Sequence, residues 1–449
     1  MRAPTPLSPS VVARFAVGSL GTGGFSTLPG LVLVFYLTDT LGVAAWVAGF
    51  VITGAKIWDV LVAPAIGGLS DRSLRRTGSR RRLMVLGAVG LPVFFWLTFS
   101  VPAGTSPGLA AAWVALAFLL ASTCFSLFQV PYIALPAELS DDYDRRTRLL
   151  TSRVAVMSLA ILLFGAGGPL LRDIGDPYTG YFTMGLVAGL VIAAGLLVAA
   201  TVAPRGAPAP SAPASSLADG YRQGWAALRR SAPFRALLGA FLLQAIATGA
   251  MLAGANYAAV QVMRSDAALT FLFVALIGPA ILCSPAWNAV ARRWGKERGF
   301  ALATLLFAVA AASLTAAVWA PGPLVYASVA VAGAAYAGMQ ALPMAMLPDV
   351  VSHDAQTFGP GHAGTFGGVW TAGETTGMAL GAGLLSAILA LTGYVPTVGN
   401  VEVDQPARAV AGIALAFSAV PALLTLASLL FLARYRLRRA DIAVTDSTH

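Results

Sequence analysis

The chain has 449 residues, of which 57% are hydrophobic and only 11% are charged, and its mean hydropathy is +0.77. This composition excludes an ordinary soluble protein and is typical of an integral membrane protein. The net charge of +10 would suggest a nucleic acid partner for a soluble domain. Here the basic residues cluster in short loops between apolar stretches, so we exclude nucleic acid and expect the lipid bilayer as the partner.

Apolar stretches follow one another along the whole chain and predict an all-α membrane protein with twelve transmembrane helices. They lie near residues 13–38, 42–70, 83–102, 108–136, 149–171, 178–203, 236–263, 267–291, 299–319, 323–348, 361–392 and 406–433. The first stretch lacks the short hydrophobic region and small-residue cleavage site of a signal peptide, so we expect it to be retained as a helix.

The second stretch combines an apolar helix with a strongly basic end, from Ile52 to Arg82. It contains Lys56 and Asp59. Asp59 precedes Asp71, taken as the helix end, by 12 residues, or about 18 Å, which places Asp59 near the bilayer midplane. Ionisable residues inside a membrane usually face water or a partner and mark a substrate or ion path. This helix therefore indicates transport.

A linker rich in proline, alanine and serine separates six helices from six. We predict an N-terminal bundle at 1–203, a cytoplasmic linker at 204–235, a C-terminal bundle at 236–434 and a cytoplasmic tail at 435–449. The two halves repeat, since Pro64 and Pro285 lie 221 positions apart at the ends of corresponding helices, and Pro131 and Pro343 lie 212 positions apart. Two pseudo-symmetric six-helix halves are the architecture of the major facilitator superfamily.

Arginine and lysine are distributed unevenly between the two sides of the predicted topology. With both termini inside, the cytoplasmic loops hold nearly all of them, and the outer loops hold only Arg172, Arg264 and Arg408. This partition predicts a multi-pass protein of the plasma (inner) membrane with both the N- and the C-terminus in the cytoplasm.

Two motifs resemble those of one transporter family. The first is Lys56-Ile57-Trp58-Asp59, followed by Pro64, Gly67-Gly68 and Ser70-Asp71-Arg72; the second runs from Val130-Pro131-Tyr132 through Pro136-Ala137-Glu138 to Asp141-Asp142 and Arg145-Arg146. Both are similar to the glycoside–pentoside–hexuronide:cation symporters, the melibiose permease family. The resemblance implies a glycoside or related sugar moved together with a cation. Sodium-dependent lysophospholipid transporters of animals share this branch.

The chain departs from the family pattern at the polar positions that matter most. A second carboxylate expected one turn after Asp59 is Ala63, and the acidic residue before the helix 4 Val-Pro pair is Gln129. The sugar-stacking aromatic position is Ile133, and the helix 1 acidic position aligns with Gly23. Because Na⁺ is held by several oxygens, a lone carboxylate suits a proton better, and a desolvated carboxyl can titrate near neutrality.

From the motifs and the family positions we assign two groups of residues. The predicted substrate or cation site consists of Lys56, Asp59, Ser126, Gln129, Tyr132, Arg153, Gln340, Trp370, Glu374 and Thr375. The predicted cytoplasmic gate consists of Asp71, Arg72, Glu138, Asp142, Arg145 and Arg146. Its charges would form inter-helix ion pairs that close the cytoplasmic side in one state.

Structural alternatives compete with these roles. Lys56 and Asp59 are three residues apart and could neutralise each other as an ion pair, and Trp370 is more often a packing residue than a stacking platform. His353 and His362 share a predicted loop with Asp349, but no third ligand spacing indicates a metal site. We expect no cofactor and no enzymatic site.

The sequence thus predicts a monomeric secondary transporter working by alternating access, with a small-molecule solute site between the halves. The favoured reading is sugar or glycoside symport with H⁺, with Na⁺ less favoured. The alternatives are an amphipathic, lysolipid-like solute, which the apolar replacements favour, and a facilitator without ion coupling.

Overall fold

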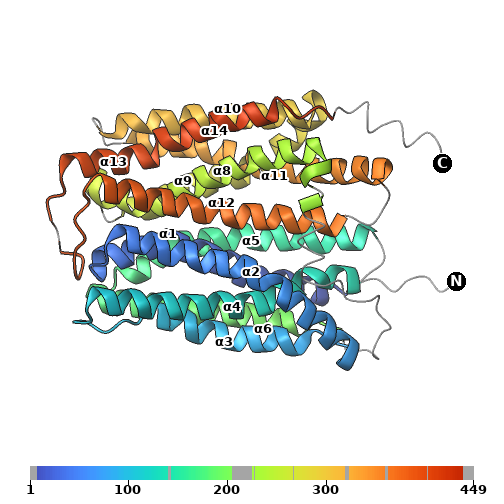
Figure 1. The fold of residues 1–449 in the computed structure, drawn as a ribbon, viewed down its shortest axis with the longest axis horizontal. Helices are drawn as coiled ribbons and strands as arrows, with labels where there is room; N and C mark the ends of the chain where they lie inside the picture. The colour runs from blue at the N-terminus through green and yellow to red at the C-terminus, as the bar shows by residue number, and fades with distance from the viewer. Residues whose placement is uncertain are drawn as a thin grey trace. The chain divides into compact units, whose positions relative to one another are not determined.

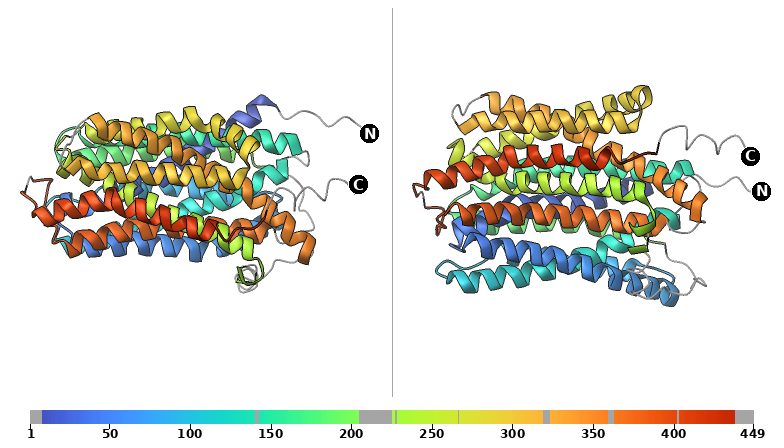
Figure 2. Two further views of the ribbon diagram at one scale, coloured as in Figure 1. Left: turned by 90° about the horizontal axis from the view of Figure 1, so that it is seen from above. Right: turned by 45° about the horizontal axis from the view of Figure 1, so that its top comes forward.

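The structure, a computed structural model, describes residues 8–139, 143–204, 225–226, 228–265, 267–318, 323–358, 363–401 and 403–437. The chain divides into two compact units (Figures 1 and 2). Unit 1 comprises Met1–Leu217 together with Pro396–Glu402, and unit 2 comprises Ala218–Val395 and Val403–His449. Within the described part, twelve helices are long and apolar enough to cross a membrane, which confirms the predicted number.

Unit 1 contains the first six spans. Its elements are α1 (Pro9–Phe35), η1 (Tyr36–Thr40), α2 (Ala45–Thr77), α3 (Arg81–Thr98), α4 (Pro107–Leu139), α5 (Tyr143–Arg172) and α6 (Pro177–Ala200). Helix α1 packs against α5 and α6, α3 packs against α4 and α6, and α2 packs against α4.

Unit 2 repeats this arrangement. Its elements are α8 (Ala232–Tyr257), η2 (Ala258–Val262), α9 (Ala268–Trp294), α10 (Lys296–Ser313), η3 (Leu314–Val318), α11 (Pro323–Phe358), α12 (Ala363–Leu391), α13 (Ala407–Phe417) and α14 (Ala419–Leu432). Helix α8 packs against α12 and α14, α10 against α11 and α14, and α9 against α11. Each pairing has its counterpart in unit 1, so both units have the same helix order and packing.

A second feature marks the repeat. The first helix of each unit ends in a five-residue π-helix, η1 after α1 and η2 after α8. Their first residues, Tyr36 and Ala258, lie 222 positions apart, close to the 221 positions that separate Pro64 on α2 from Pro285 on α9. Because π-helices are rare in proteins, their presence at corresponding places supports the duplicated architecture.

Local sequence signals explain several helix ends. Asp176 caps α6 by accepting hydrogen bonds from the N–H groups of Tyr178 (3.0 Å) and Thr179 (3.2 Å), and hydrogen bonds from Thr179 and Tyr178 lower the pKa of Asp176. Ser231 caps α8 in the same way. Gly78 ends α2 in a left-handed conformation (φ 64°), with its N–H donated to the carbonyl of Leu74.

Two helices extend further than predicted. Helix α2 was expected to end at Asp71 with Arg72 in the following loop, but it continues to Thr77. The stretch from Leu69 to Thr77 contains no glycine or proline, so nothing stops the helix before Gly78. Helix α11 likewise continues to Phe358, so His353 lies on a helix and not in a loop.

The last span is interrupted. The predicted stretch 406–433 forms two helices, α13 and α14, separated at Ser418, whose φ and ψ are −128° and −80°. The Ser418 hydroxyl donates to the carbonyl of Ala414 (2.6 Å) and its N–H to that of Leu415 (3.3 Å). These bonds satisfy carbonyl groups that the break leaves without a helical partner.

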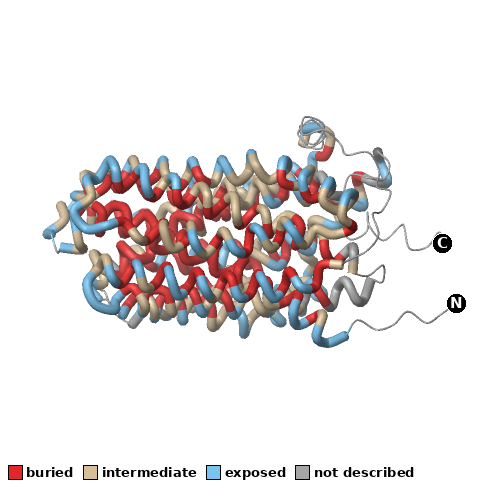
Figure 3. Tube along the Cα trace, turned by 90° about the horizontal axis from the view of Figure 1, so that it is seen from below, coloured by how far each residue is buried: buried red, intermediate tan, exposed pale blue. Residues whose placement is uncertain are grey.

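Buried and exposed residues alternate around the helices of each unit (Figure 3). In unit 1 an aromatic cluster fills the interior, where Phe25 stacks on Phe125 with ring centroids 4.5 Å apart and also contacts Phe95 and Phe118. In unit 2, Gly333 of α11 packs closely against α9, and an added Cβ would lie 1.9 Å from the carbonyl oxygen of Leu276 on α9. Only glycine, which has no Cβ, fits at this contact without moving the helices apart.

Candidate functional site

Asp59 sits at the centre of its membrane span and forms a hydrogen bond with α4. The span runs from Ala45 to Leu74, and Asp59 lies at its middle. The Ser126 hydroxyl donates to the Asp59 carboxylate, and Ser126 itself is buried, with 4% exposure. One residue earlier, the Trp58 indole N–H donates to the hydroxyl of Thr123 at 3.0 Å. The α2 motif therefore contacts a polar face of α4.

Lys56 and Asp59 form no ion pair in the described part of the chain. The ammonium group of Lys56 instead lies over the ring of Phe25, 5.7 Å from its centroid, a distance that allows a cation–π interaction. The structure therefore contradicts the alternative in which Lys56 and Asp59 form an ion pair with each other. A buried aromatic ring holds the cation, and a serine hydroxyl holds the carboxylate.

Gln129 and Tyr132 face α1. The Thr22 hydroxyl donates to the Gln129 side-chain carbonyl at 2.9 Å. Tyr132 is fully buried; its hydroxyl donates to the Phe15 backbone carbonyl at 2.7 Å, and its ring stacks on Phe15. In this conformation Tyr132 is a packing residue.

Arg153 of α5 lies over the ring of Tyr132. Its guanidinium carbon is 5.6 Å from the centroid of the Tyr132 ring, and its Nε is buried without a hydrogen-bond partner. A buried N–H group without an acceptor costs free energy, which an acceptor oxygen on a bound molecule would recover. The structure thus brings together Asp59, Ser126, Gln129, Tyr132 and Arg153 within unit 1, on α2, α4 and α5.

Gly23, the position that aligns with the family's helix 1 acidic residue, lies at the contact between α1 and α5. An added Cβ would lie 2.7 Å from the Ala160 side chain and 3.1 Å from the Met157 carbonyl oxygen. No carboxylate fits there without separating the two helices, so Gly23 serves helix packing.

The predicted site residues of unit 2 lie on α11 and α12. Trp370 is 2% exposed and stacks on Phe241 with centroids 4.2 Å apart, which makes it a packing residue in this structure. The Gln340 amide donates to the Tyr336 hydroxyl at 2.9 Å, and Glu374 lies close enough to Tyr336 to interact with it electrostatically. Thr375 is half-buried.

The predicted cytoplasmic gate falls mostly outside the described side chains. Arg72 is exposed on α2. Residue Asp142 lies outside the described residues, and the same holds for the side chains of Asp71, Glu138, Arg145 and Arg146. The gate stays a prediction.

Ion pairs that the sequence did not reveal occur in unit 2, on the side predicted to be cytoplasmic. Arg230 binds Asp354 with two parallel hydrogen bonds, 3.0 Å from Nε and 2.7 Å from Nη2, and Asp354 is 1% exposed. Lys296 pairs with Asp349 at 2.6 Å. The bidentate pair of Arg230 with the buried Asp354 adds geometric specificity as well as energy to the contact between these two segments.

Burial raises the pKa of the nearby Tyr435, and the charges of Asp349 and Glu297 raise this pKa further, so the Tyr435 phenol stays neutral.

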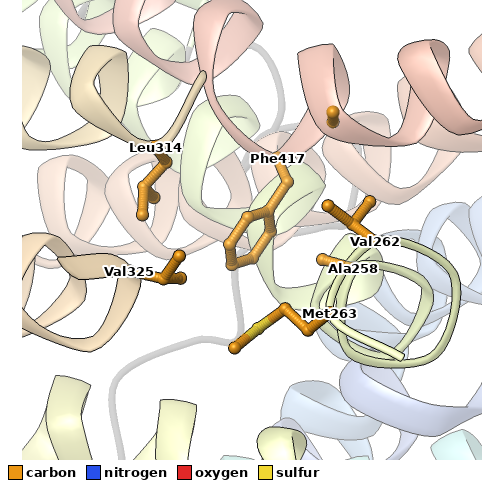
Figure 4. A pocket seen from close by; sticks show the side chains of 7 residues that line it. Ala258, Val262, Met263, Leu314, Val325 and Phe417 are labelled. Carbon is orange, nitrogen blue, oxygen red and sulfur yellow. The ribbon is translucent and has the colours of Figure 1, made fainter. Parts of the chain in front are cut away.

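Two further features of the described residues bear on metal and solute binding. Within the described residues no three His, Cys, Asp or Glu side chains could share a metal ion. A pocket beside η2 has a volume of about 10 Å³ (Figure 4), close to the minimum for one water. All of its lining residues are apolar: Ala258, Val262, Met263, Leu314, Val325, Ala414 and Phe417. It is too small and too apolar for a polar solute.

Some residues of the polar group were missed, although a signal existed. Thr123, Ser126 and Gln129 recur every three residues and therefore lie along one face of α4. This spacing marks Thr123 as a member of the group. Thr22 and Tyr336 were missed because a single threonine or tyrosine in an apolar helix carries no pattern.

Comparisons with known proteins agree with this architecture. A sequence profile of the family described as MFS/sugar transport protein matches residues 14–439. An uncharacterized symporter of Synechocystis is 32% identical over 34% of this chain and 30% of its own length. A putative glycoside/cation symporter of Escherichia coli is 30% identical over 35% of each chain. These matches span only about a third of the relatives' lengths.

A longer, weaker match is to a transporter whose name gives a different solute. A sodium-dependent lysophosphatidylcholine symporter of the mouse is 23% identical over 72% of this chain and 66% of its own. Among solved structures, a nucleoside transporter superimposes with a TM-score of 0.68 at 14% identity, covering 95% of this chain and 100% of its own. At such identity the likeness concerns the fold.

Proposed function

This chain belongs to the MFS/sugar transport protein family of membrane transporters, and from that premise we propose that it moves a glycoside-type solute together with a proton. It is a multi-pass membrane transporter and not an enzyme. The solute, the coupling ion and the orientation are our proposals, each resting on particular residues.

The polar group of unit 1 supports a hydroxylated solute. Gln129 has two amide donors, Arg153 has a buried Nε without an acceptor, and Ser126 and Thr22 have hydroxyl groups. Such a set exchanges hydrogen bonds with sugar hydroxyls. The glycoside name of a relative that matches a third of the chain agrees with this class of solute.

The contact between Asp59 and Ser126 carries the proposal of proton coupling. When Asp59 is ionised, the Ser126 hydroxyl donates to it, as observed; when Asp59 is protonated, its O–H can donate to the Ser126 oxygen. Both protonation states therefore keep a hydrogen bond. Na⁺ would need several oxygen ligands, whereas the position one turn after Asp59 is Ala63.

Uptake into proteoliposomes tests the coupling ion. We expect an inwardly directed proton gradient to drive accumulation of a responsive glycoside, and an inwardly directed Na⁺ gradient at symmetric pH to leave uptake at its passive level. Candidate glycosides and hexuronides are first chosen by the rise in melting temperature that a bound ligand causes. Uptake that requires Na⁺ at constant pH would refute proton coupling.

A lysolipid-like solute is the second candidate. It is favoured by Ile133, which is 52% exposed where the family resemblance has a sugar-stacking aromatic residue, and by the long match to the mouse lysophosphatidylcholine symporter. In the same melting experiment, stabilisation by lysophosphatidylcholine and by no glycoside would establish this alternative in place of the sugar.

The distribution of basic residues supports an orientation with both termini in the cytoplasm. In a variant whose two native cysteines, Cys124 and Cys283, are replaced by alanine, a cysteine at Gly104 should react with a membrane-impermeant maleimide in intact cells. A cysteine at Gly295 should react only after permeabilisation. The reverse pattern would show that the topology is inverted.

A further inference from the structure

A short segment between α12 and α13 belongs to unit 1, although the helices on both sides of it belong to unit 2. We call residues 396–401 the strap; it lies in the loop at one end of the helices (Figure 1). Three of its N–H groups donate to η1 carbonyls at 2.9 Å: Thr397 to Thr38, Asn400 to Asp39, and Gly399 to Thr40.

Side chains strengthen this contact. The Thr397 hydroxyl donates to the Asp39 carbonyl at 3.0 Å, and the Thr40 hydroxyl donates to the Asn400 side-chain carbonyl at 2.7 Å. Leu41 and Val398 form an antiparallel bridge. Asn400 has a φ of 54°, a left-handed conformation that asparagine tolerates better than most residues. The strap is thus shaped to fit η1.

The carbonyls that the strap binds are the last ones of the first span. The final carbonyl groups of a helix have no partner within it and must find one elsewhere. In this structure the strap supplies most of these partners. Because this end of the helices is predicted to face the outer solution, water can replace the strap when it leaves, so the contact is reversible.

The base of the strap is fixed to the other unit. The Val395 N–H donates to the Gln405 side-chain carbonyl, and the Gln405 amide donates to the Val395 carbonyl, both at 2.9 Å. Val395 and Gln405 both belong to unit 2. Thr397 follows Val395 by two residues, which span at most about 7 Å when extended. A larger separation between η1 and this base must break one of the two sets of hydrogen bonds.

We propose that the strap is a latch on the outer side, which holds η1 in one conformation and must release η1 for the transporter to complete its cycle. Movement of one half of the fold against the other is the basis of alternating access in such transporters. The inference rests on the proposed transport function, and the experiment below separates the two.

A disulfide across the bridge tests the latch directly. Paired residues of antiparallel strands have Cα atoms about 4.5 to 5.5 Å apart, within the range of a disulfide. In the cysteine-free background, Leu41→Cys with Val398→Cys should lose uptake by at least about tenfold on oxidation and regain it with a reductant. Each single variant should be insensitive to oxidant. Full uptake by the oxidised double variant would refute the latch.

A weakened latch should favour release. Thr397→Val removes a hydroxyl without changing shape, and Asn400→Gly removes the side-chain acceptor while keeping the left-handed backbone accessible. The combined variant carries spin labels at positions 104 and 265, in place of Gly104 and Ser265 in outer loops of the two units. The distance between the two labels is measured by pulsed electron paramagnetic resonance. We expect the population of molecules with the longer distance between labels to increase. The control Thr392→Val, just after α12, loses a hydroxyl that donates only to the neighbouring carbonyls of Ile388 and Leu389 and should leave the distribution unchanged.

These two measurements separate failure of the latch from failure of the proposed function. An unchanged distance distribution in the weakened variant would refute the latch whatever the solute is. A shift towards longer distances supports it even if no glycoside is transported, because the distance measurement requires no solute.

Discussion

Asp59→Asn should abolish accumulation of the solute against its gradient while leaving exchange intact. At a membrane potential of 100 mV, one coupled proton supplies about 2.3 kcal/mol, enough for roughly 50-fold accumulation. Asparagine keeps an oxygen that can accept from Ser126 but cannot take up a proton, so the variant should only equilibrate the solute. Uptake driven by a membrane potential and counterflow, measured in proteoliposomes, give the two readouts.

The matched control is Asp404→Asn, which removes an exposed carboxylate outside the membrane spans and should transport like the parent protein. Asp59→Asn should also retain the parent melting temperature, because Asp59 forms no ion pair with Lys56 whose loss would strand a charge. Accumulation by Asp59→Asn at the parent level would exclude this carboxylate as the proton carrier. Loss of counterflow together with accumulation would show that Asp59 acts in solute binding.

Gly333→Ala should be among the most destabilising single changes in unit 2. Its added Cβ would lie 1.9 Å from the Leu276 carbonyl oxygen and 2.9 Å from the Leu276 Cα. Backbone atoms cannot move aside as a flexible side chain can, so α9 and α11 must separate. Overpacking typically costs about 1 to 3 kcal/mol, and we expect a clear fall in the melting temperature of the detergent-solubilised protein.

Gly278→Ala provides the matched comparison on the same pair of helices. An added Cβ at Gly278 meets no atom within 4 Å, and alanine is favoured over glycine in a helix by up to about 1 kcal/mol. This variant should be as stable as the parent or slightly more so. Equal melting temperatures for the two variants would mean that the α9–α11 contact is looser than the structure indicates.

The number and position of the helices could be predicted because a membrane span needs about 20 apolar residues and leaves a direct mark on hydropathy. Helix ends were harder to place. Charge marks the membrane surface and therefore predicts a loop after Leu69, yet charge does not stop a helix. Only Gly78 does, so α2 extends past the apolar region.

The candidate site was predictable only in part. Asp59 and Gln129 stood out because polar residues are costly in a membrane, but their partners depend on which helix faces which. The family pattern aligned Gly23 with an acidic residue, but only the structure shows that Gly23 packs against Ala160 and that this contact leaves no space for a larger side chain. The contact between the strap and η1 could not be predicted from the sequence. Backbone hydrogen bonds between residues about 360 positions apart do not depend on residue type.

The paired π-helices bear on the history of the chain. A π-turn closes its hydrogen bond one residue later than an α-turn, so η1 and η2 each accommodate one residue more than a regular helix would. Both occur at the end of the first helix of a unit, 222 positions apart at Tyr36 and Ala258. If the two units descend from one six-helix ancestor, a single inserted residue in that ancestor accounts for both. The insertion then predates the gene duplication, and the π-helical end of the first helix is older than the twelve-helix transporter itself.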